Sequence, residues 1–491
     1  MKKKYFIFSS ITFCMLFVLI SCRNTQQFNE EKNQKPNFVI IFCDDLGYGD
    51  IASFGNPIIR TPNLDIMANE GQKWTQFYVA DPVCTPSRAG LLTGRYPIRS
   101  GMTSSVRPVF FPDSANGLKS EEITIAEVLK EQGYKSAAVG KWHLGHLPQF
   151  LPQSQGFDSY YGIPYSNDMD AERGTFMEYY NNSINSDYIA KIEGFNVPII
   201  ENTKDIERPA DQTTITKRYT ERAVSFINEN KSNPFFLYLA HSLPHIPLFA
   251  SENFLGKSKG GLYADVIEEI DWSVGQVIKS LKDNNLERNT IVMFTSDNGP
   301  WLLFKTHGGS SGPLRAGKGT TFEGGQRVPT IFWGPGNVKP GIISEMGSTL
   351  DIINTFAEMS GAELPTDRKM DGYDLSKVLT EKAVSPRDEF HYWAFAELHA
   401  IRKDKWKLHI KQRKPVMYSS PTIILDKPEL YDLNSDISEK YDISDKKPKI
   451  VSAMLKSIDL HLKDVEGSTP DQLVDRIDGY NMRTEELKND N

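Results

Sequence analysis

Four apolar segments stand out along the chain, and each is followed directly by polar residues. They consist mainly of Val, Ile, Leu, Phe and Ala, and they cover residues 37–43, 136–139, 235–240 and 290–295. Continuous apolar runs of this length are typical of strands that a parallel sheet buries on both faces. Long stretches separate the segments, which leaves room for the connecting helices that parallel strands need.

Helix signals lie between these expected strands. Pro62 predicts a helix start and Gly71 its end. Thr124 and Glu127 have the spacing of a capping box, and apolar residues recur at helical spacing over residues 267–281. Alternating strands and helices predict an α/β fold with a mostly parallel, doubly wound sheet. Because ligands bind beyond the carboxyl ends of such strands, we expect the polar strand ends to meet in one site.

The pattern changes near residue 386. Short, half-alternating segments then predict a small antiparallel sheet, with strands expected at residues 390–395, 400–402, 406–410 and 430–432. A last helix is expected over residues 449–463. The sequence therefore predicts a main domain over residues 36–385, an antiparallel α+β subdomain over residues 386–470 and a polar tail over residues 471–491.

Composition narrows the class of protein. The chain has 491 residues, 39% of them hydrophobic and 24% charged, so it can build a large core. Its 56 Lys and Arg against 63 Asp and Glu give a net charge of −7, and we expect no nucleic-acid partner that is held by bulk positive charge. Only four cysteines are present, which excludes a disulfide-rich scaffold.

The N-terminus has the pattern of an export signal. Three lysines precede an apolar stretch over residues 5–20 that is short for a membrane span, and Leu-Ile-Ser-Cys22 ends it. This ending resembles the lipobox of bacterial lipoproteins, whose Cys is lipidated after cleavage. We expect a signal peptide over residues 1–21, which removes Cys14, and a flexible tether over residues 22–35. An ordinary secretory signal is the alternative.

These expectations place the body outside the cytoplasm. Lipid on Cys22 would anchor it to a bacterial membrane, on the periplasmic face or at the cell surface. The residues after Cys22, Arg-Asn-Thr-Gln, leave both faces open.

Two strand ends carry oxygen donors. Asp44 and Asp45 follow the first strand, and Asp297 and Asn298 follow the strand over residues 290–295. Carboxylate and amide oxygens suit hard divalent cations, and no His/Cys cluster has zinc spacing. The sequence therefore predicts a site for Ca²⁺ or Mg²⁺, although a lone Asp-Asp pair is often only a turn or a helix cap.

Cys84 begins the most specific motif, Cys84-Thr-Pro-Ser-Arg88, which continues to Leu-Thr-Gly-Arg95. A Cys just ahead of a helix is either a nucleophilic thiol or an inert buried residue. The motif resembles the signature of the formylglycine-dependent sulfatases, in the alkaline-phosphatase-like superfamily, in which this Cys is oxidised to Cα-formylglycine. Further segments resemble family motifs in the family's order: Asp44 to Asp50, Thr61 to Asp65, Gly140 to His143, His241 to His245, Ser296 to Gly299, Gly317-Lys318, Glu323 to Pro329 and Glu429 to Asp432.

The resemblance implies a role for each residue of the site. One divalent cation, usually Ca²⁺ in the bacterial relatives and less often Mg²⁺, would be bound by Asp44, Asp45, Cys84 as formylglycine, Asp297 and Asn298. The hydrated aldehyde of residue 84 would attack sulfur and release the alcohol. Arg88 and Lys141 would hold and polarise it, and His143 would take the proton from its second hydroxyl as sulfate leaves.

Three further residues are expected at the substrate. By the same resemblance, His245 and Lys318 would grip the sulfate group and protonate the leaving alcohol. Lys141 would also contact the substrate. His307 lies between two of these motifs, and its position favours a substrate contact over a purely structural role.

We therefore expect a sulfatase that hydrolyses sulfate esters of a sulfated polysaccharide or its oligosaccharides. Algal polymers such as ulvan or carrageenan are favoured by analogy only, and glycosaminoglycans are the alternative. A formylglycine-installing maturation enzyme would be a second partner. A phosphoester or phosphonate-ester hydrolase of the same superfamily, and a lipoprotein that binds glycan without turnover, are the rival interpretations.

Overall fold

The computed structural model describes residues 35–414 and 421–480. Cys14, Cys22 and the expected signal peptide lie outside the described residues, as does most of the expected tether. The chain from Asn37 onward forms one compact unit. Within the described ranges, no helix combines the length and the apolar character that crossing a membrane requires.

A large mixed sheet carries the fold. Its strands are β1 (Asn37–Cys43), β2 (Gln72–Tyr78), β3 (Lys135–Gly140), β4 (Ser159–Gly162), β5 (Ile199–Glu201), β6 (Lys204–Glu207), β7 (Phe235–Ala240), β8 (Thr290–Ser296), β9 (Arg327–Trp333), β10 (Gly341–Ile343) and β11 (Gly347–Ser348). The order is β10-β2-β9-β8-β1-β7-β3-β4-β5-β6, with β11 also beside β2. Strands β8, β1, β7 and β3 are parallel neighbours, as the four apolar segments predict, and β4 adds a further parallel strand beside β3.

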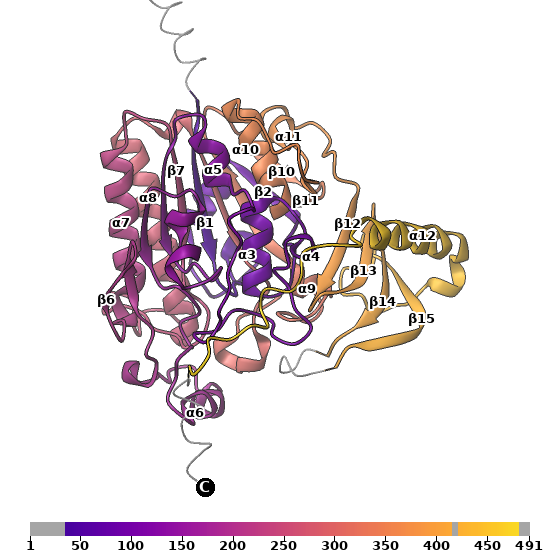
Figure 1. Cartoon of the computed structure of the whole chain (residues 1–491), viewed down its shortest axis with the longest axis horizontal. Coiled ribbons are helices and arrows are strands. Elements are labelled where there is room, and N and C mark those ends of the chain that lie inside the picture. The colour runs from indigo at the N-terminus through magenta and orange to yellow at the C-terminus, as the bar shows by residue number, and fades with distance from the viewer. Residues whose placement is uncertain (1–34, 415–420, 481–491) are drawn as a thin grey trace, which may run out of the picture. The chain divides into compact units, whose positions relative to one another are not determined.

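Helices cover both faces of this sheet (Figure 1). They are α2 (Pro62–Glu70), α3 (Cys84–Thr93), α4 (Pro97–Ser100), α5 (Ile125–Lys130), α6 (Thr175–Asn182), α7 (Ile215–Glu229), α8 (Gly261–Asp283), α9 (Glu323–Gln326), α10 (Ile352–Ser360) and α11 (Ser376–Glu381). Strand β1 shows the two-sided burial. Phe38 and Ile40 lie in one hydrophobic cluster with residues of α5 and α10, while Val39 and Ile41 lie in a second cluster with residues of α7 and α8. The doubly wound fold is thereby confirmed.

Two strands of the large sheet run against the parallel direction: β5, near one end, which is antiparallel to β4 and β6, and β9, inside the sheet. Strand β9 lies between β8 and β2 and is antiparallel to both. Its segment contains Pro329, and a proline residue cannot donate to a sheet ladder. The pattern of apolar positions therefore gives no clear strand signal there.

The C-terminal region forms a second sheet. Its antiparallel strands are β12 (Glu389–Ala394), β13 (Glu397–Lys403), β14 (Trp406–Gln412) and β15 (Ile423–Asp432), followed by α12 (Pro448–Asp464). This confirms the predicted antiparallel α+β subdomain. Met454 and Ile458 of α12 pack in a third cluster with Leu408 and Leu430 of the sheet, and Tyr78 of β2 belongs to the same cluster. The subdomain thus shares a core with the main domain.

Buried charges also join the two regions. The carboxylate of Glu323, in α9, accepts hydrogen bonds from Tyr78 (2.6 Å) and Tyr392 (2.8 Å) and from Nζ of Lys407 (2.9 Å). Nζ of Lys407 also lies 2.9 Å from Oε1 of Glu439, which His409 contacts at 2.8 Å. The side chains of Glu323, Lys407 and Glu439 have no exposed surface. We refer to these three residues as the interface triad.

The end of the chain returns to the main domain. The amide of Ile477 donates to the carbonyl of Asp113 (2.8 Å), and the amide of Ala115 donates to the carbonyl of Asp475 (3.0 Å). Leu473 is fully buried in a cluster of the main domain. Residues 471–480 therefore pack against the catalytic domain, whereas the sequence predicts a polar tail from residue 471 onward. In Figure 1 this yellow segment runs from α12 back across the molecule.

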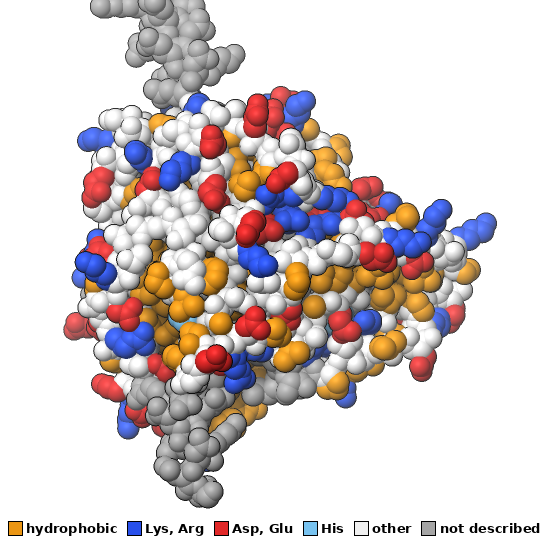
Figure 2. All heavy atoms as spheres, in the orientation of Figure 1, with side chains coloured by type: hydrophobic (Ala, Val, Ile, Leu, Met, Phe, Trp, Pro, Cys, Tyr) orange, Lys and Arg blue, Asp and Glu red, His pale blue; other side chains and the backbone are white. Residues whose placement is uncertain are grey.

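Charges are mixed on the surface shown in Figure 2. Acidic and basic side chains alternate across this face, and hydrophobic side chains surround a hollow at its lower left. The net charge of −7 is therefore not concentrated in one acidic field on this face.

Candidate active site

The carboxyl ends of neighbouring strands meet at one edge of the sheet. Cys43 at the end of β1 pairs with Ser296 at the end of β8, so the residues after these strand ends lie side by side. The amide of Asp45 donates to Oδ1 of Asp297 at 3.2 Å. Gly140 at the end of β3 pairs with Ala240 at the end of β7 in the same way. The convergence expected from the sequence is therefore present.

Cys84 is the first residue of α3 and lies at the centre of this edge. Its Sγ lies 3.4 Å from Oδ1 of Asp44 and 3.4 Å from Nζ of Lys318, and only 2% of the residue is exposed. Burial, and then the charge of Asp44, raise the pKa of this thiol well above its ordinary value. The thiol is therefore protonated at neutral pH, which argues against an unmodified thiolate nucleophile.

The carboxylates beside Cys84 form a candidate cation site. Ligand atoms of Asp44, Asp45, Cys84 and His245 all lie within 4.8 Å of one another. Burial raises the pKa of Asp45 to about 7 despite the opposing charge of Lys318, and burial together with the charge of Asp44 raises the pKa of Asp297. Crowded, buried carboxylates of this kind are stabilised by a bound cation.

Asn298 completes the donor set. Its Nδ2 donates to Oδ1 of Asp45 (2.6 Å). Its Oδ1 is buried and, within the described residues, has no hydrogen-bond partner. An orphaned amide oxygen beside crowded carboxylates is the arrangement that a hard divalent cation would satisfy, so the residues present fit the expected metal.

Fixed cations surround the carboxylates. Arg88 donates from Nε (3.0 Å) and Nη2 (2.8 Å) to Oδ2 of Asp297, and from Nη1 to the carbonyl of Lys141 (2.9 Å). Nζ of Lys141 pairs with Oδ2 of Asp44, and Nζ of Lys318 lies 2.7 Å from Oδ1 of Asp45. Burial alone would raise the pKa of Asp44, but Lys141, His245 and Arg88 hold that pKa well below its ordinary value.

His143 has one ring nitrogen fixed and one available. Its backbone has a left-handed φ of 61°, which is a strained conformation for a non-glycine residue. Nε2 donates to the carbonyl of Phe110 at 2.9 Å, which leaves Nδ1 unprotonated and, within the described residues, without a partner. Burial and the charge of Lys141 lower the pKa of His143 well below its ordinary value. The neutral ring can therefore accept a proton at Nδ1.

His245 follows β7 in the turn that begins at His241. Its Nδ1 donates to the carbonyl of Ile246 at 2.6 Å, so Nε2 points to Oδ2 of Asp45 (3.6 Å) and to Oγ of Ser166 (3.3 Å). Burial and the charge of Lys318 lower the pKa of His245 well below its ordinary value. His245 is thus oriented toward the site.

His307 is placed differently from the expectation. Its Nδ1 lies 2.7 Å from the hydroxyl of Tyr179, and its Nε2 lies 3.0 Å from the carbonyl of Asn185. Only 1% of the residue is exposed, and it is not among the residues that line the pocket above Cys84. Both ring nitrogens are thus occupied by other residues, so the structure itself gives no support to the predicted substrate contact of His307.

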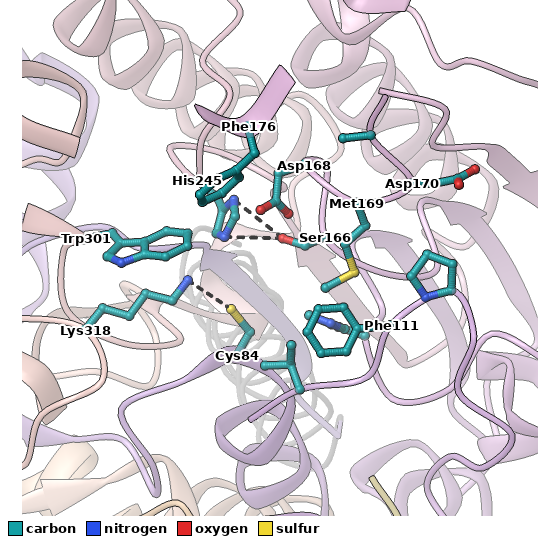
Figure 3. A pocket seen from close by; sticks show the side chains of 14 residues that line it. Cys84, Phe111, Ser166, Asp168, Met169, Asp170, Phe176, His245, Trp301 and Lys318 are labelled. Atoms are coloured by element: carbon teal, nitrogen blue, oxygen red, sulfur yellow. Dashed lines mark hydrogen bonds between the residues drawn. The ribbon is translucent and has the colours of Figure 1, made fainter. Parts of the chain in front are cut away.

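The pocket above Cys84 has a volume of about 280 Å³ (Figure 3). The sequence interpretation identifies Cys84, His143, His245 and Lys318 in its lining, and it misses the rest of the wall. Those further residues are Val109, Phe111, Pro112, Ser166, Asp168, Met169, Asp170, Ala171, Phe176 and Trp301. Most of them lie in segments between helices and strands, where no periodic pattern marks them. The one usable signal is that residues 166–171 follow the end of a strand, β4.

Trp301 is held by the site itself. Nζ of Lys318 lies 4.5 Å from the centre of its ring, and the His245 ring lies 5.5 Å away. A cation over an aromatic face is attractive, so Lys318 is fixed between Asp45 and Trp301. The pocket therefore has positively charged side chains at its bottom and a largely apolar wall.

Known proteins share both the sequence and this architecture. The chain matches the Sulfatase family over residues 36–362 and the C-terminal region of aryl-sulfatase over residues 385–479. Arylsulfatase A of Bos taurus is 38% identical over 442 residues, which cover 86% of each chain. N-acetylgalactosamine-6-sulfatase of Mus musculus is 39% identical over 385 residues, which cover 77% of this chain and 72% of that protein.

A solved structure agrees with these relatives. The crystal structure of Ps i-CgsB in complex with k-i-k-neocarrahexaose superposes with a TM-score of 0.74 at 31% identity, and it covers 89% of this chain and 94% of that chain. The two family matches together reach from residue 36 to residue 479, so they cover almost all of the described structure. The chain therefore belongs to the sulfatase family and is a sulfuric ester hydrolase.

Proposed function

We propose that the protein is an exported, lipid-anchored sulfatase that removes sulfate from a sulfated polysaccharide or its oligosaccharides. In this proposal residue 84 works as formylglycine and a divalent cation, Ca²⁺ in preference to Mg²⁺, assists it. The observation that carries the proposal is the position of Cys84. It lies at the start of α3, between the carboxylate of Asp44 and the ammonium group of Lys318, at the base of the pocket.

Residue 84, once oxidised and hydrated, would supply a hydroxyl nucleophile to sulfur. The surrounding residues would orient this hydroxyl group and surround it with positive charge. Lys141 and Arg88, both fully buried, would keep the base of the pocket cationic around it. His143 would take a proton at Nδ1, which the hydrogen bond of Nε2 to Phe110 leaves free to accept one.

His245 and Lys318 would contact the leaving alcohol on the other side of the pocket. His245 presents Nε2 there, because Nδ1 is held by the carbonyl of Ile246. Nζ of Lys318 lies beside Sγ of Cys84, at 3.4 Å. Lys318, as an ammonium group, would bind the sulfate oxygens and could supply the proton that the alcohol needs, and His245 would share both tasks once the bound anion has brought a proton to its Nε2.

A divalent cation would be held by Asp44, Asp45, Asp297 and Asn298. It would add positive charge where the sulfuryl group is transferred, which lowers the energy of the anionic transition state. Oxygen donors alone favour Ca²⁺ or Mg²⁺ over softer metals, and the resemblance to bacterial relatives favours Ca²⁺.

Two observations support a saccharide substrate. The pocket is lined by aromatic and aliphatic side chains such as Phe111 and Trp301, against which the apolar face of a sugar ring can stack. Named relatives include an N-acetylgalactosamine-6-sulfatase and a structure in complex with k-i-k-neocarrahexaose. These names favour galactose-type sugars of animal glycosaminoglycans or of algal carrageenan, and ulvan has no such support.

The cellular location rests on the sequence alone. Leu-Ile-Ser-Cys22 at the end of a short apolar stretch would direct lipidation of Cys22 and anchor the enzyme to a bacterial membrane. Polymeric substrates do not enter the cytoplasm intact, so an anchored enzyme outside it would meet them directly.

Two measurements test the proposal together. Mass spectrometry of the peptide that holds residue 84, from protein made in its native host, should show formylglycine, and free sulfate release should exceed phosphate release from matched aryl esters. Cys84→Ala should lose sulfate release, with Cys43→Ala as the matched control because Cys43 is a buried thiol of β1 that does not line the pocket. An intact thiol at residue 84 in active protein, or faster cleavage of the aryl phosphate, would overturn it.

A further inference from the structure

Asp168 stands out among the polar residues of the pocket wall. It belongs to residues 166–171, which follow β4 and lie along one side of the pocket. In Figure 3 its carboxylate lies between His245 and Met169, next to Ser166. None of the roles in the proposed mechanism uses this carboxylate.

The polar neighbours of Asp168 form hydrogen bonds or ion pairs with other residues of the protein, whereas one carboxylate oxygen of Asp168 does not. Asp170 accepts a hydrogen bond from Nδ2 of Asn196 (2.8 Å) and lies 3.6 Å from Nη1 of Arg208. Oγ of Ser166 accepts from Nζ of Lys141 (3.0 Å). By contrast, Oδ1 of Asp168 is buried and has no hydrogen-bond partner within the described residues. A buried acceptor without a donor is costly, so its presence calls for a donor from outside the chain.

The chemistry of the pocket narrows what that donor is. Asp168 is not among the four residues whose ligand atoms cluster within 4.8 Å, so it is separate from the candidate cation site. The wall around it is apolar, through Met169, Phe111 and Phe176. A substrate O–H or N–H group is therefore the partner that the pocket admits.

The position of Asp168 fixes where this donor lies on the substrate. Ser166 lies 3.3 Å from Nε2 of His245, and Sγ of Cys84 and Nζ of Lys318 mark where the sulfate group reacts. Asp168 is two residues beyond Ser166 on the same wall. A donor that reaches it must come from a part of the sugar close to the sulfated carbon.

We propose that Asp168 is a specificity-determining residue that accepts a hydrogen bond from an O–H or N–H group next to the sulfated position of the sugar. This inference rests on the proposed saccharide sulfatase function. The same carboxylate repels a second sulfate group at that neighbouring position, because such a group offers a negative charge and no donor. The enzyme therefore selects sugars that are sulfated at one position and unmodified beside it.

Substitution of Asp168 tests the inference through a ratio of activities. Wild-type kcat/KM is measured on 2-, 3-, 4- and 6-sulfates of galactose and N-acetylgalactosamine, on carrageenan and chondroitin oligosaccharides, and on 4-nitrophenyl sulfate, which has no neighbouring donor. Asp168→Leu removes the acceptor at similar volume. We expect the ratio of sugar-sulfate to aryl-sulfate kcat/KM to be at least about tenfold lower in Asp168→Leu than in the wild type. Asp168→Asn keeps one acceptor oxygen, so its ratio should lie between those of the wild type and Asp168→Leu.

Glu172→Gln is the matched control, because Glu172 is an exposed acidic residue that follows the same segment and does not line the pocket. Its ratio should stay at the wild-type value. Equal losses on sugar and aryl sulfates in Asp168→Leu would assign the residue a structural role and overturn the inference alone. A wild-type enzyme that cleaves 4-nitrophenyl sulfate but none of the sugars would overturn the proposed saccharide function instead.

Discussion

Removal of the Lys407 ammonium group should destabilise the protein strongly. Its Nζ lies 2.9 Å from carboxylate oxygens of both Glu323 and Glu439, and none of the three side chains is exposed. Lys407→Met would leave two buried carboxylates close together without the cation between them. Breaking a buried ion pair from one side costs about 3–5 kcal/mol, so we expect the free energy of unfolding to fall by about that amount.

The pH dependence of the loss follows from the same charges. Burial alone would raise the pKa of Glu323 and of Glu439, but Lys407 outweighs it and holds both below their ordinary value. Carboxylates with a lowered pKa add stability above the pKa of the unfolded chain, about 4.3, and that stability is lost as the pH falls. The difference between Lys407→Met and the wild type should therefore be largest at neutral pH and shrink below about pH 4.

Equilibrium urea denaturation, followed by tryptophan fluorescence, measures both effects. Lys405→Met is the matched control, since Lys405 pairs with Asp432 at 2.8 Å on the surface, with 41% of the lysine side chain exposed. An exposed pair contributes at most about 1 kcal/mol. If Lys407→Met proved no more destabilising than Lys405→Met at neutral pH, the interface triad would not hold the two regions together.

Three other predictions concern the site and its supports. Gly140→Ala should give little folded protein in a solubility and circular dichroism assay, because a Cβ there would lie 1.8 Å from the carbonyl oxygen of Ala240 at a φ of +111°, whereas Gly133→Ala, with open space around it, should fold. Treatment with a strong chelator should abolish sulfate release and Ca²⁺ should restore it; full activity in the chelator would refute the cation site. Burial lowers the pKa of His241 to about 4, so the folded state resists protonation that the unfolded chain accepts below about pH 6.5. Stability should therefore fall on acidification by up to about 1.4 kcal/mol per pH unit for this residue, and His241→Gln should show a shallower urea-midpoint slope between pH 6.5 and pH 4.5.

The parallel strands and the residues at their carboxyl ends can be predicted from the sequence, because both follow simple rules. Apolar runs mark the parallel strands, and the topology of such a sheet brings their carboxyl ends together. That rule places Asp45 beside Asp297 and brings Lys141 and His245 to the same edge, as the structure has them. The family motifs then add roles that no pattern of polarity contains.

Other features depend on tertiary contacts that leave no local pattern. Asp168 and Trp301 lie in connecting segments, and only the folded chain shows that they face the pocket. The partners of His307 are hidden for the same reason, because proximity in sequence to two motifs does not reveal Tyr179 and Asn185 as its contacts. Strand β9 escapes prediction because Pro329 interrupts its apolar segment, and only the folded chain shows that it lies between β8 and β2.

The return of residues 471–480 to the main domain changes how the C-terminal subdomain is connected. The chain enters the subdomain through residues 386–388 and leaves it through the segment that hydrogen-bonds to Asp113 and Ala115. The position of the subdomain is thus fixed by two crossings of the chain in addition to the shared core. The first crossing is a covalent link, and the second is held to the main domain by hydrogen bonds and by the burial of Leu473. A hinge at a single linker would not release it, so the described body should behave in proteolysis and in extension by force as one unit, with no stable separate C-terminal fragment.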